Sequence, residues 1–434
     1  MTARRLTNRI TIHATTPLLL GEKSGMSNFE QSLDFIPGAT LRGAVARRAL
    51  QHCTQPEYKN NHAACPDRDR CPFWQLFSED DIYFGNAYAG ISDPVSPLPL
   101  TAHTCKYYPG IPEADSQRAR EDAHGVWDTL LERLIHEALV DPQFPRRAEI
   151  LPELGERIPK LPAWAYKETC PNCGKTAQPA DGYYIPGTLL APAGHVPISR
   201  RMHVGINRAR FAAEDSLLFA QESLDTRGTR INFFAQVSAP EAKLELLNQY
   251  LNGSHALGRG RSRGYGMVEI ATSAPRQGQD LSTRFASLQM AGEQVLRAWL
   301  GEEKAADSPG KFSAQLFSLT LTSPAILETF GSPYLLPTAR DIGIPEAFLL
   351  RAWTKPTVIS GWDVAAGLPR RTRQAAVAGS VFLFAVPVGL EDVLPRLALL
   401  EENGLGEERA RGFGQLQVCA PIHFNSLRDF GRSL

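Results

Sequence analysis

The chain carries the segment Leu257-Gly-Arg-Gly-Arg-Ser-Arg-Gly-Tyr-Gly-Met-Val-Glu-Ile270 and, farther along, the related segment Leu405-Gly-Glu-Glu-Arg-Ala-Arg-Gly-Phe-Gly-Gln-Leu-Gln-Val418. We call residues 257–266 the first turn and residues 405–414 the second turn. Six positions correspond: Gly258 with Gly406, Arg261 with Arg409, Arg263 with Arg411, Gly264 with Gly412, Tyr265 with Phe413 and Gly266 with Gly414. Agreement at so many positions is not expected by chance, so the pattern predicts one structural module used twice.

The residue types in these turns favour an anionic backbone as ligand. Glycine tolerates positive φ, which lets successive main-chain N–H groups point into a concavity that receives phosphate. Arginine adds charge and a planar group that pairs with phosphate or stacks on a base. The alternative is a tight helix-to-strand connection with solvated arginines. The predicted RNA-binding residues are Arg42, Gly258, Arg259, Gly260, Arg261, Arg263, Gly264, Tyr265, Gly266, Arg409, Arg411 and Gly412.

The charge of the chain is balanced. Lysine and arginine total 46 residues, as do aspartate and glutamate, among 434 residues. No global field therefore draws the protein toward nucleic acid or a membrane, and RNA affinity would have to come from local clusters. Such clusters occur at Arg42, Arg47 and Arg48, at Arg200 and Arg201, at 259–263, and at Arg370, Arg371 and Arg373, although each alone also fits a solvated face.

Targeting signals are not recognisable. The N-terminal residues lead into an alternating strand pattern without an apolar signal region, and no apolar run approaches the length of a membrane span. We therefore expect a cytoplasmic protein without a membrane partner. In a reducing compartment the seven cysteines are expected as thiols or metal ligands.

The order of elements around each turn predicts an α+β fold of two ferredoxin-like (RRM-like) domains. A strand at 8–20, a helix at 35–50 with Thr40 as N-cap, a helix at 241–251 and a strand at 267–271 follow the split βαβ order. The order returns with strands at 317–327 and 380–386 and a helix at 391–402. The predicted domains are 1–272, with a cysteine-containing insertion at about 53–200, and 311–434, joined by a helical linker at 273–310.

The insertion contains half of a zinc-binding motif. Cys170 and Cys173 flank a Pro-Asn pair, a spacing that directs two thiolates at one tetrahedral ion. Two further ligands are required, and we favour Cys105 and His124 over the pair Cys65 and Cys71. The zinc is expected to be structural, because no His-Glu-x-x-His or deaminase pattern accompanies these residues.

Catalytic signatures are missing from the sequence. It has no Walker-type phosphate loop, kinase signature or Gly-x-Ser-x-Gly elbow. His52, near Arg47 and Arg48, is the best candidate base for RNA cleavage, but a surface or helix-capping role fits it better. Asp34 and Asp363 fit turn positions better than catalytic ones.

The segments Phe35-Ile-Pro-Gly-Ala-Thr-Leu-Arg-Gly-Ala and 258–266 resemble the RAMP superfamily of CRISPR-associated proteins. In the second half, Ser360-Gly-Trp-Asp, Gly367-Leu-Pro-Arg and Ala378-Gly-Ser-Val-Phe-Leu-Phe extend the resemblance. Together with Thr104-Cys-Lys, His124-Gly-Val and Cys170-Pro-Asn-Cys, the chain is most similar to the large double-domain RAMP subunit of type III-D effector complexes.

The resemblance implies a non-catalytic subunit that holds the repeat-derived 5′ tag of CRISPR RNA in antiviral defense. Its implied partners are the polymerase-like large subunit and backbone RAMP subunits of a type III complex. Because Glu407 and Glu408 replace Arg259 and Gly260, the second turn is electrostatically weaker and could face protein instead of RNA. The alternatives are a guide-processing endoribonuclease on the same fold, and an assembly scaffold that does not touch RNA.

Overall fold

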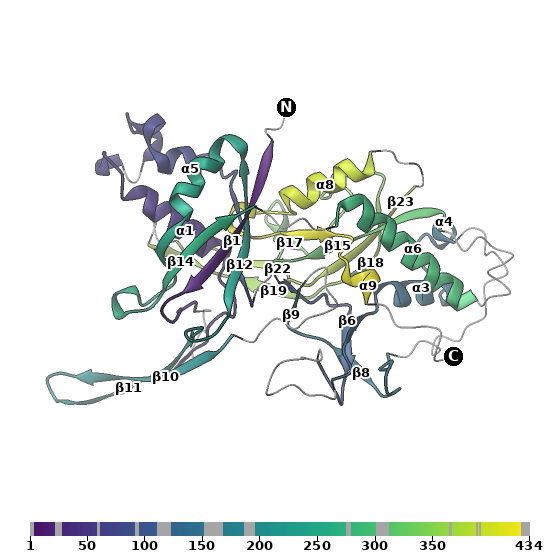
Figure 1. Ribbon diagram of the computed structural model, residues 1–434, viewed down its shortest axis with the longest axis horizontal. Helices are drawn as coiled ribbons and strands as arrows, with labels where there is room; N and C mark the ends of the chain where they lie inside the picture. Colours follow the sequence, from purple (N-terminus) through teal and green to yellow (C-terminus); the bar gives the residue numbers. More distant parts are fainter. Residues whose placement is uncertain are drawn as a thin grey trace.

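The computed structural model has a mixed α+β architecture with several antiparallel sheets (Figure 1). It describes residues 4–21, 28–58, 61–91, 95–110, 123–151, 168–185, 196–274, 279–300, 312–363, 367–387, 389 and 392–426. Parts of the predicted insertion (111–122, 152–167 and 186–195) and of the predicted linker (275–278 and 301–310) lie outside the described residues. Two sheets form the main body, and each has its own hydrophobic core.

The first sheet has the strand order β13-β14-β1-β12-β3, and β4 also pairs with β12. Its strands are β1 (Arg5–Ala14), β3 (Tyr83–Phe84), β4 (Tyr88–Gly90), β12 (Asn232–Pro240), β13 (Gly253–Ala256) and β14 (Met267–Ser273). In β1, Ile10, Ile12 and Ala14 are buried and alternate with more exposed residues, as expected for a strand with one face on a core. The helices α1 (Gly38–Leu50), α2 (Pro72–Phe77) and α5 (Glu241–Leu251) contribute side chains to this core.

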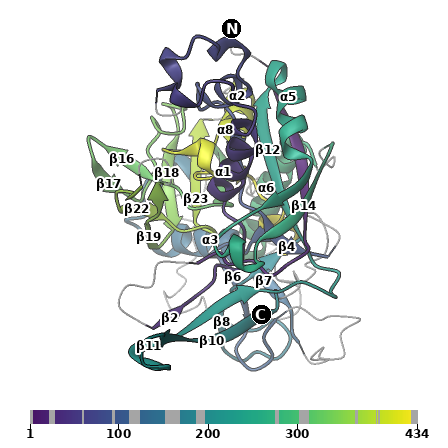
Figure 2. The same cartoon turned by 90° about the vertical axis from the view of Figure 1, so that its left-hand side faces the viewer.

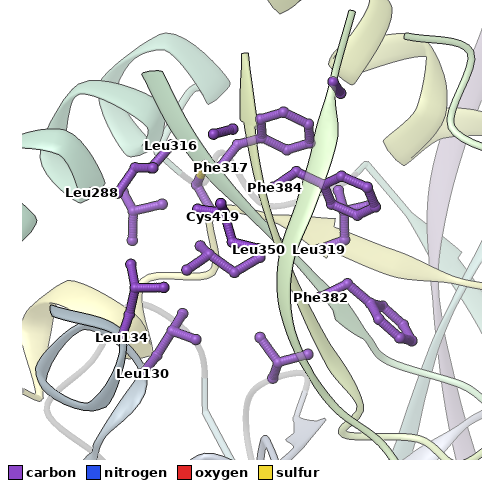
Figure 3. Close-up of a cluster of buried hydrophobic side chains, with 14 of the residues drawn as sticks. Leu130, Leu134, Leu288, Leu316, Phe317, Leu319, Leu350, Phe382, Phe384 and Cys419 are labelled. Atoms are coloured by element: carbon purple, nitrogen blue, oxygen red, sulfur yellow. The ribbon is translucent and has the colours of Figure 1, made fainter. Parts of the chain in front are cut away.

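The second sheet has the order β18-β23-β15-β24. Its strands are β15 (Ala314–Leu321), β18 (Phe348–Trp353), β23 (Val381–Pro387) and β24 (Leu416–Val418). Six consecutive residues of β23, from Val381 to Val386, are 0% exposed, so both faces of this strand are covered. Figure 3 shows Phe317, Phe382 and Phe384 in this core.

The two sheets place corresponding strands in the same order. The last strand (β14 or β24) lies beside the first (β1 or β15), which lies beside the third (β12 or β23), and the short second strand (β3 or β18) follows. The helix before the last strands also corresponds, as α5 or α8 (Val393–Asn403). Between β15 and β18, the described residues contain no counterpart of α1. The duplication therefore extends beyond the turns, although the second copy is reduced.

The helix predicted as a linker is instead part of the second core. Helix α6 (Leu281–Leu300) buries Phe285, Leu288 and Val295 against the second sheet. The prediction of a linker was wrong for this helix because flanking Ser, Pro and Gly mark its ends but do not reveal which face it buries.

The predicted insertion is also partly integrated. Strands β3 and β4 and helix α2 fall inside 53–200 but belong to the first sheet and its core. Farther along, α3 (Leu130–Val140) packs beside α6 over the second core, where Leu130 and Leu134 approach Leu288 (Figures 1 and 3). Residues between the first helix and last helix of copy one thus complete the core of copy two.

A long hairpin projects from the body below the first sheet (Figures 1 and 2). It is formed by β10 (Ile198–Asn207) and β11 (Ala212–Leu224), with β2 (Phe29–Glu30) parallel to β11. The second copy has a shorter hairpin of β19 (Pro356–Ile359) and β22 (Arg373–Ala376). The isolated bridges Leu18–Leu224 and Ala325–Ala376 join each hairpin to the segment that follows the first strand of its copy, β1 or β15.

The remaining elements are short. They are β5 (Ser96–Pro97), β6 (Ala102–Cys105), β7 (Val126–Asp128), β8 (Ala177–Pro179), β9 (Tyr183–Tyr184), β16 (Leu327–Thr329), β17 (Ser332–Tyr334), β20 (Trp362–Asp363), β21 (Leu368–Pro369), α4 (Arg147–Ile150) and α9 (Ile422–Asn425). Within the described part of the chain, no helix combines the length and apolar character needed to cross a membrane.

Candidate nucleic-acid interface and metal centre

The two turns share a hydrogen-bond frame. Each closes on itself, since Leu257 N donates to Gly266 O at 2.7 Å and Leu405 N donates to Gly414 O at 2.8 Å. Each is also anchored to the segment after the first strand of its copy. In the first copy, Arg259 N donates to Leu19 O at 3.0 Å and Gly266 N donates to Pro17 O at 2.9 Å. The corresponding bonds of the second copy run from Glu407 N to Ile326 O at 2.9 Å and from Gly414 N to Pro324 O at 2.8 Å. The predicted module is therefore one backbone structure used twice.

Glycine is required at the closing position. Gly266 has φ +88°, and a Cβ there would lie 2.1 Å from Leu257 O. At Gly414, with φ +68°, it would lie 1.7 Å from Leu405 O. No side chain fits between two backbones this close, which explains why the sequence pattern retains glycine here.

The first turn presents arginines to solvent. Arg259, Arg261 and Arg263 are all exposed. Arg259 forms an ion pair with Glu30 at 2.5 Å. Arg261 and Arg263 lie on one 3-10 helix, η6 (Arg261–Arg263), and neither forms an ion pair with any residue that the structure describes. Among the residues that the structure describes, this turn therefore carries two cations without an ion-pair partner, beside a glycine-rich backbone.

Tyr265 packs beneath the first turn. Its side chain is 8% exposed and lies against Gly260, where an added Cβ would be 3.2 Å from the ring. Arg201, from β10, donates to the Tyr265 hydroxyl at 3.3 Å. The ring supports the turn in this structure, and the exposed surface of the turn is formed by its arginines.

The second turn is neutralised by its own glutamate. Glu408 accepts hydrogen bonds from Arg411 at 2.8 Å and from Arg373 at 3.2 Å, and it lies 3.7 Å from Arg370. Glu408 has φ +54° and occupies the position of Gly260, which has φ +67°. The clusters predicted around 370–373 and 409–411 thus meet around one carboxylate.

The second turn also lies against the first copy. Gly412 is buried, and a Cβ there would lie 2.7 Å from Phe84 O in β3. Gly38, at the start of α1, approaches the same carbonyl and Arg411 O. The expectation that Gly412 faces RNA is not met, because this residue allows close contact between the two copies. Arg409 stays exposed and lies over the Tyr83 ring at 5.7 Å.

Arg42 is also engaged within the protein. It lies on α1, forms an ion pair with Asp80 and stacks over the Phe77 ring at 4.9 Å. Its side chain is 17% exposed. Arg42 therefore differs from Arg261 and Arg263 in having its charge already paired.

The predicted metal ligands are brought together. One ligand atom from each of Cys105, His124, Cys170 and Cys173 lies within 4.8 Å of all the others. The Sγ atoms of Cys105 and Cys173 are 3.7 Å apart, and His124 Nδ1 is 3.3 Å from Cys170 Sγ. Two thiolates bonded to a tetrahedral zinc ion at about 2.3 Å are separated by about 3.8 Å. The four side chains therefore fit a closed zinc site, and the sulfur separation excludes a disulfide.

Local structure explains this convergence. Cys105 ends β6, and Cys170 and Cys173 lie in a tight turn closed by Gly174 N donating to Cys170 O at 2.9 Å. Gly174 has φ +67°, which permits the reversal. Strand β8 then pairs with β6 and returns the chain beside Cys105. His124 approaches from the segment before β7, and its ring lies 4.5 Å from the Tyr108 ring.

The environment favours a thiolate at Cys105. Burial opposes ionisation of this thiol, but hydrogen bonds from the backbone of Tyr108 and Tyr107 and from the neighbouring thiols lower its pKa to about 7. Burial raises the pKa of Cys170. A cation between these groups would remove the cost of that burial, because metal ions bind the deprotonated thiol.

Residues considered for catalysis occupy ordinary positions. His52 is exposed, its Nδ1 lies 3.3 Å from Arg48 O, and its ring packs edge-on against Tyr250. Asp34 accepts a hydrogen bond from the Tyr183 hydroxyl at 3.0 Å. The pairing of Arg259 with Glu30 could not be predicted, because partners distant in sequence leave no local pattern. Glu408 was expected to weaken the second turn, but its contacts with Arg370 and Arg373 were not expected, for the same reason.

Comparison with known families confirms the resemblance carried by the two turns, which is that of a CRISPR-associated protein of the RAMP superfamily. The matching family model is described as CRISPR-associated protein (Cas_Cmr3) and covers residues 31–420, so the chain belongs to this family. The type III-D subtype stays a prediction. No curated protein matches the chain.

Solved structures show distant similarity. A chain of the type III-B Cmr-beta complex bound to cognate target RNA is 12% identical, with a TM-score of 0.40 and coverage of 86% of each chain. A chain of the Csm3-Csm4 subcomplex of the type III-A CRISPR-Cas interference complex is 10% identical, with a TM-score of 0.33. That match covers 88% of this chain and 94% of the other.

Proposed function

We propose that this protein is a non-catalytic RNA-binding subunit of a type III CRISPR effector complex, where it holds the 5′ tag end of CRISPR RNA. The observation that carries the proposal is the first turn, in which exposed Arg261 and Arg263 have no ion-pair partner among the described residues and flank positive-φ glycines. Membership of the Cas_Cmr3 family supports the CRISPR context.

The proposal includes two ferredoxin-like domains, for which the shared strand order of the two sheets is the support. The first would bind RNA through its turn, and the second would use its turn to hold the two copies together. The neutralisation of Arg411 by Glu408 and the burial of Gly412 support this division. Other subunits of the complex, both the polymerase-like large subunit and backbone RAMP subunits, are the proposed protein partners, and the cytoplasm is the proposed location.

We further propose a structural zinc ion at Cys105, His124, Cys170 and Cys173. The support is the distance between their ligand atoms and the burial of Cys105 and Cys170. The ion would supply four bonds that connect β6, the segment before β7 and the turn before β8. A closed set of four protein ligands leaves no open position for substrate, in keeping with a structural role.

The first prediction compares matched positions of the two turns. Replacing Arg261 and Arg263 by Ala should weaken binding of a repeat-derived CRISPR RNA by roughly tenfold, because two phosphate contacts are lost. The slope of log K against log salt should fall by about 1.4 for single-stranded RNA. The matched variant, Arg409→Ala with Arg411→Ala, should bind nearly as wild type. Filter binding and salt titration with the full chain measure both effects.

Two outcomes would support the alternatives. Unchanged RNA affinity in the first-turn variant, with the complex still assembling, would favour the assembly scaffold. Cleavage of the repeat RNA by wild type that is lost in His52→Ala would favour the endoribonuclease. Cross-linking in the assembled complex then locates the contact, which we expect between the 5′ tag and residues 258–266.

A further inference from the structure

A second group of cysteines lies outside the site described above. Cys53, Cys65 and Cys71 line one pocket of about 220 Å³, together with His62, between α1 and α2. All three cysteines are free thiols. This pocket is remote in the sequence from the Cys105 cluster and uses none of its residues.

The segment that forms the pocket has almost no core of its own. From residue 51 to residue 71, Cys65 is the only buried residue in the described part of the segment. Its backbone is folded into three short 3-10 helices, η1 (Pro56–Tyr58), η2 (His62–Ala64) and η3 (Arg68–Arg70). Short segments without an apolar core usually need a disulfide or a metal ion to hold one conformation.

We propose that Cys53, Cys65, Cys71 and His62 bind a second structural zinc ion. Three thiolates and one imidazole form a standard closed zinc site. The ion would replace the missing apolar core of the segment and fix the connection between α1 and α2.

Hydrogen bonds bring the segments that carry these four residues close together. Cys65 N donates to His62 O at 3.2 Å, which closes a 3-10 turn in which residues three apart point in the same direction. Asp67 accepts hydrogen bonds from Gln55 at 2.8 Å and Thr54 at 3.2 Å. These bonds connect the residues directly after Cys53 to the loop directly after Cys65. Cys71 follows η3 and precedes the first turn of α2.

His62 is a better fourth ligand than His52, which also lines the pocket. The His62 ring packs against the Phe73 ring, with centroids 4.5 Å apart and planes tilted by 39°, and its nitrogens form no hydrogen bond with the residues that the structure describes. His52 Nδ1 instead lies against Arg48 O at 3.3 Å. His62 therefore has a nitrogen lone pair available in its neutral form.

The charge of the pocket complements such a site. Zinc with three thiolates and one neutral imidazole carries a net charge of about −1. Arg68, Arg70 and Asp67 line the same pocket, so these three side chains together supply a formal charge of +1 beside it. In the described residues, only the Cys105 cluster already has its ligand atoms within 4.8 Å of one another. Closure of the second pocket would therefore accompany metal binding, as is common in small metal-held segments.

The first test is elemental analysis of the full chain purified without chelator. We expect about two zinc ions per chain in wild type and about one in both Cys65→Ser and Cys170→Ser. The combined variant should contain almost none. Cys419→Ala is the control and should keep two, because Cys419 belongs to the second hydrophobic core. One zinc in wild type that Cys65→Ser does not reduce would overturn the proposal.

A second measurement uses wild type and does not depend on folding of a variant. Iodoacetamide labelling followed by peptide mass spectrometry should modify Cys53, Cys65 and Cys71 at least tenfold faster after a chelator is added. Equal labelling rates with and without chelator would contradict the proposal. So would a disulfide between two of these cysteines in protein purified under reducing conditions, since a metal site needs the thiolates. Both tests are independent of RNA binding and leave the proposed function untouched.

Discussion

Two nearby glycines of the first turn, Gly264 and Gly266, differ in the reason why glycine is needed. Gly264 and Gly266 have φ of +85° and +88°, but an added Cβ meets nothing within 4 Å at Gly264 and lies 2.1 Å from Leu257 O at Gly266. Gly264→Ala should destabilise the protein by about 1–2 kcal/mol, the cost of left-handed backbone. Gly266→Ala should cost more, because the bond from Leu257 N to Gly266 O must also give way. Equal losses in thermal unfolding would contradict the closing role of Gly266.

The interaction of Glu328 with Arg373 leads us to expect that the stability of the protein depends on pH. A hydrogen bond from Arg373 holds the pKa of this carboxyl below its ordinary value despite opposing burial. A depressed folded-state pKa stabilises the protein above the unfolded value of about 4.3, and this contribution disappears as pH falls through the folded pKa. Glu328→Gln should therefore lower Tm by about 2–4 °C at pH 7, and the difference from wild type should shrink between pH 5 and pH 3.

The control for this prediction is Glu407→Gln. Glu407 is exposed and forms no ion pair with any described residue, so this change should leave Tm nearly unaltered across the same range. A constant difference between wild type and Glu328→Gln at all pH values would show that packing, and not ionisation, accounts for the effect.

At the element scale, the turns and metal ligands could be predicted because their chemistry is local and uses rare residue types. Paired Cys170 and Cys173 predict a tetrahedral ion, and few cysteines and histidines exist to complete it. The residues that flank helix α6 do not reveal its buried face, but the pattern within the helix does. Phe285, Leu288 and Val295 recur at helical spacing and indicate a buried face. Strand β3 has two residues, too few for any periodicity to reveal.

The elements that carry the proposed zinc ligands allow a prediction of where removal of the metal would loosen the structure. Cys105 ends β6, while Cys170 and Cys173 precede β8, and the two strands pair directly. Adding a chelator should raise amide hydrogen exchange in β6, β7 and β8 by at least tenfold, because the four-ligand connection between them is removed. Peptides from β15 and β23 should change little. Cys105→Ser should show the raised exchange without chelator; unchanged exchange in either case would contradict a structural metal.

In the whole molecule, the two copies are in direct contact and contribute residues to each other's surface and core. Gly38 and Gly412 meet at the Phe84 carbonyl, so the second turn is built into the surface of the first copy. Helix α3 lies between strands of the first sheet in sequence but packs over the second core (Figure 1). Neither contact could be predicted from the sequence, because a glycine at an interface and an apolar helix face do not identify their partners.

This interleaving leads to a prediction about which sheet responds to a core mutation. Leu134, on α3, is 0% exposed and lies in the second core. In the sequence, however, α3 lies between β4 and β12, which are two strands of the first sheet. Leu134→Ala should destabilise its core by about 2–5 kcal/mol through lost contacts and a cavity. Hydrogen exchange should therefore rise in β15 and β23 more than in β1 and β12. The matched control is Leu247→Ala on α5, also 0% exposed but in the first core, which should give the reverse distribution.

Comparing Leu134→Ala with Leu247→Ala tests whether the second sheet depends on the first copy for its stability. If the copies were joined only by a linker, Leu134→Ala would raise exchange around the insertion itself and leave both sheets unaltered. Raised exchange in β15 and β23 would instead mean that the second sheet depends on residues supplied by the first copy. The same dependence implies that residues 312–434 expressed alone should expose the face that α3 and α6 cover, and should bind hydrophobic dyes more strongly than the full chain.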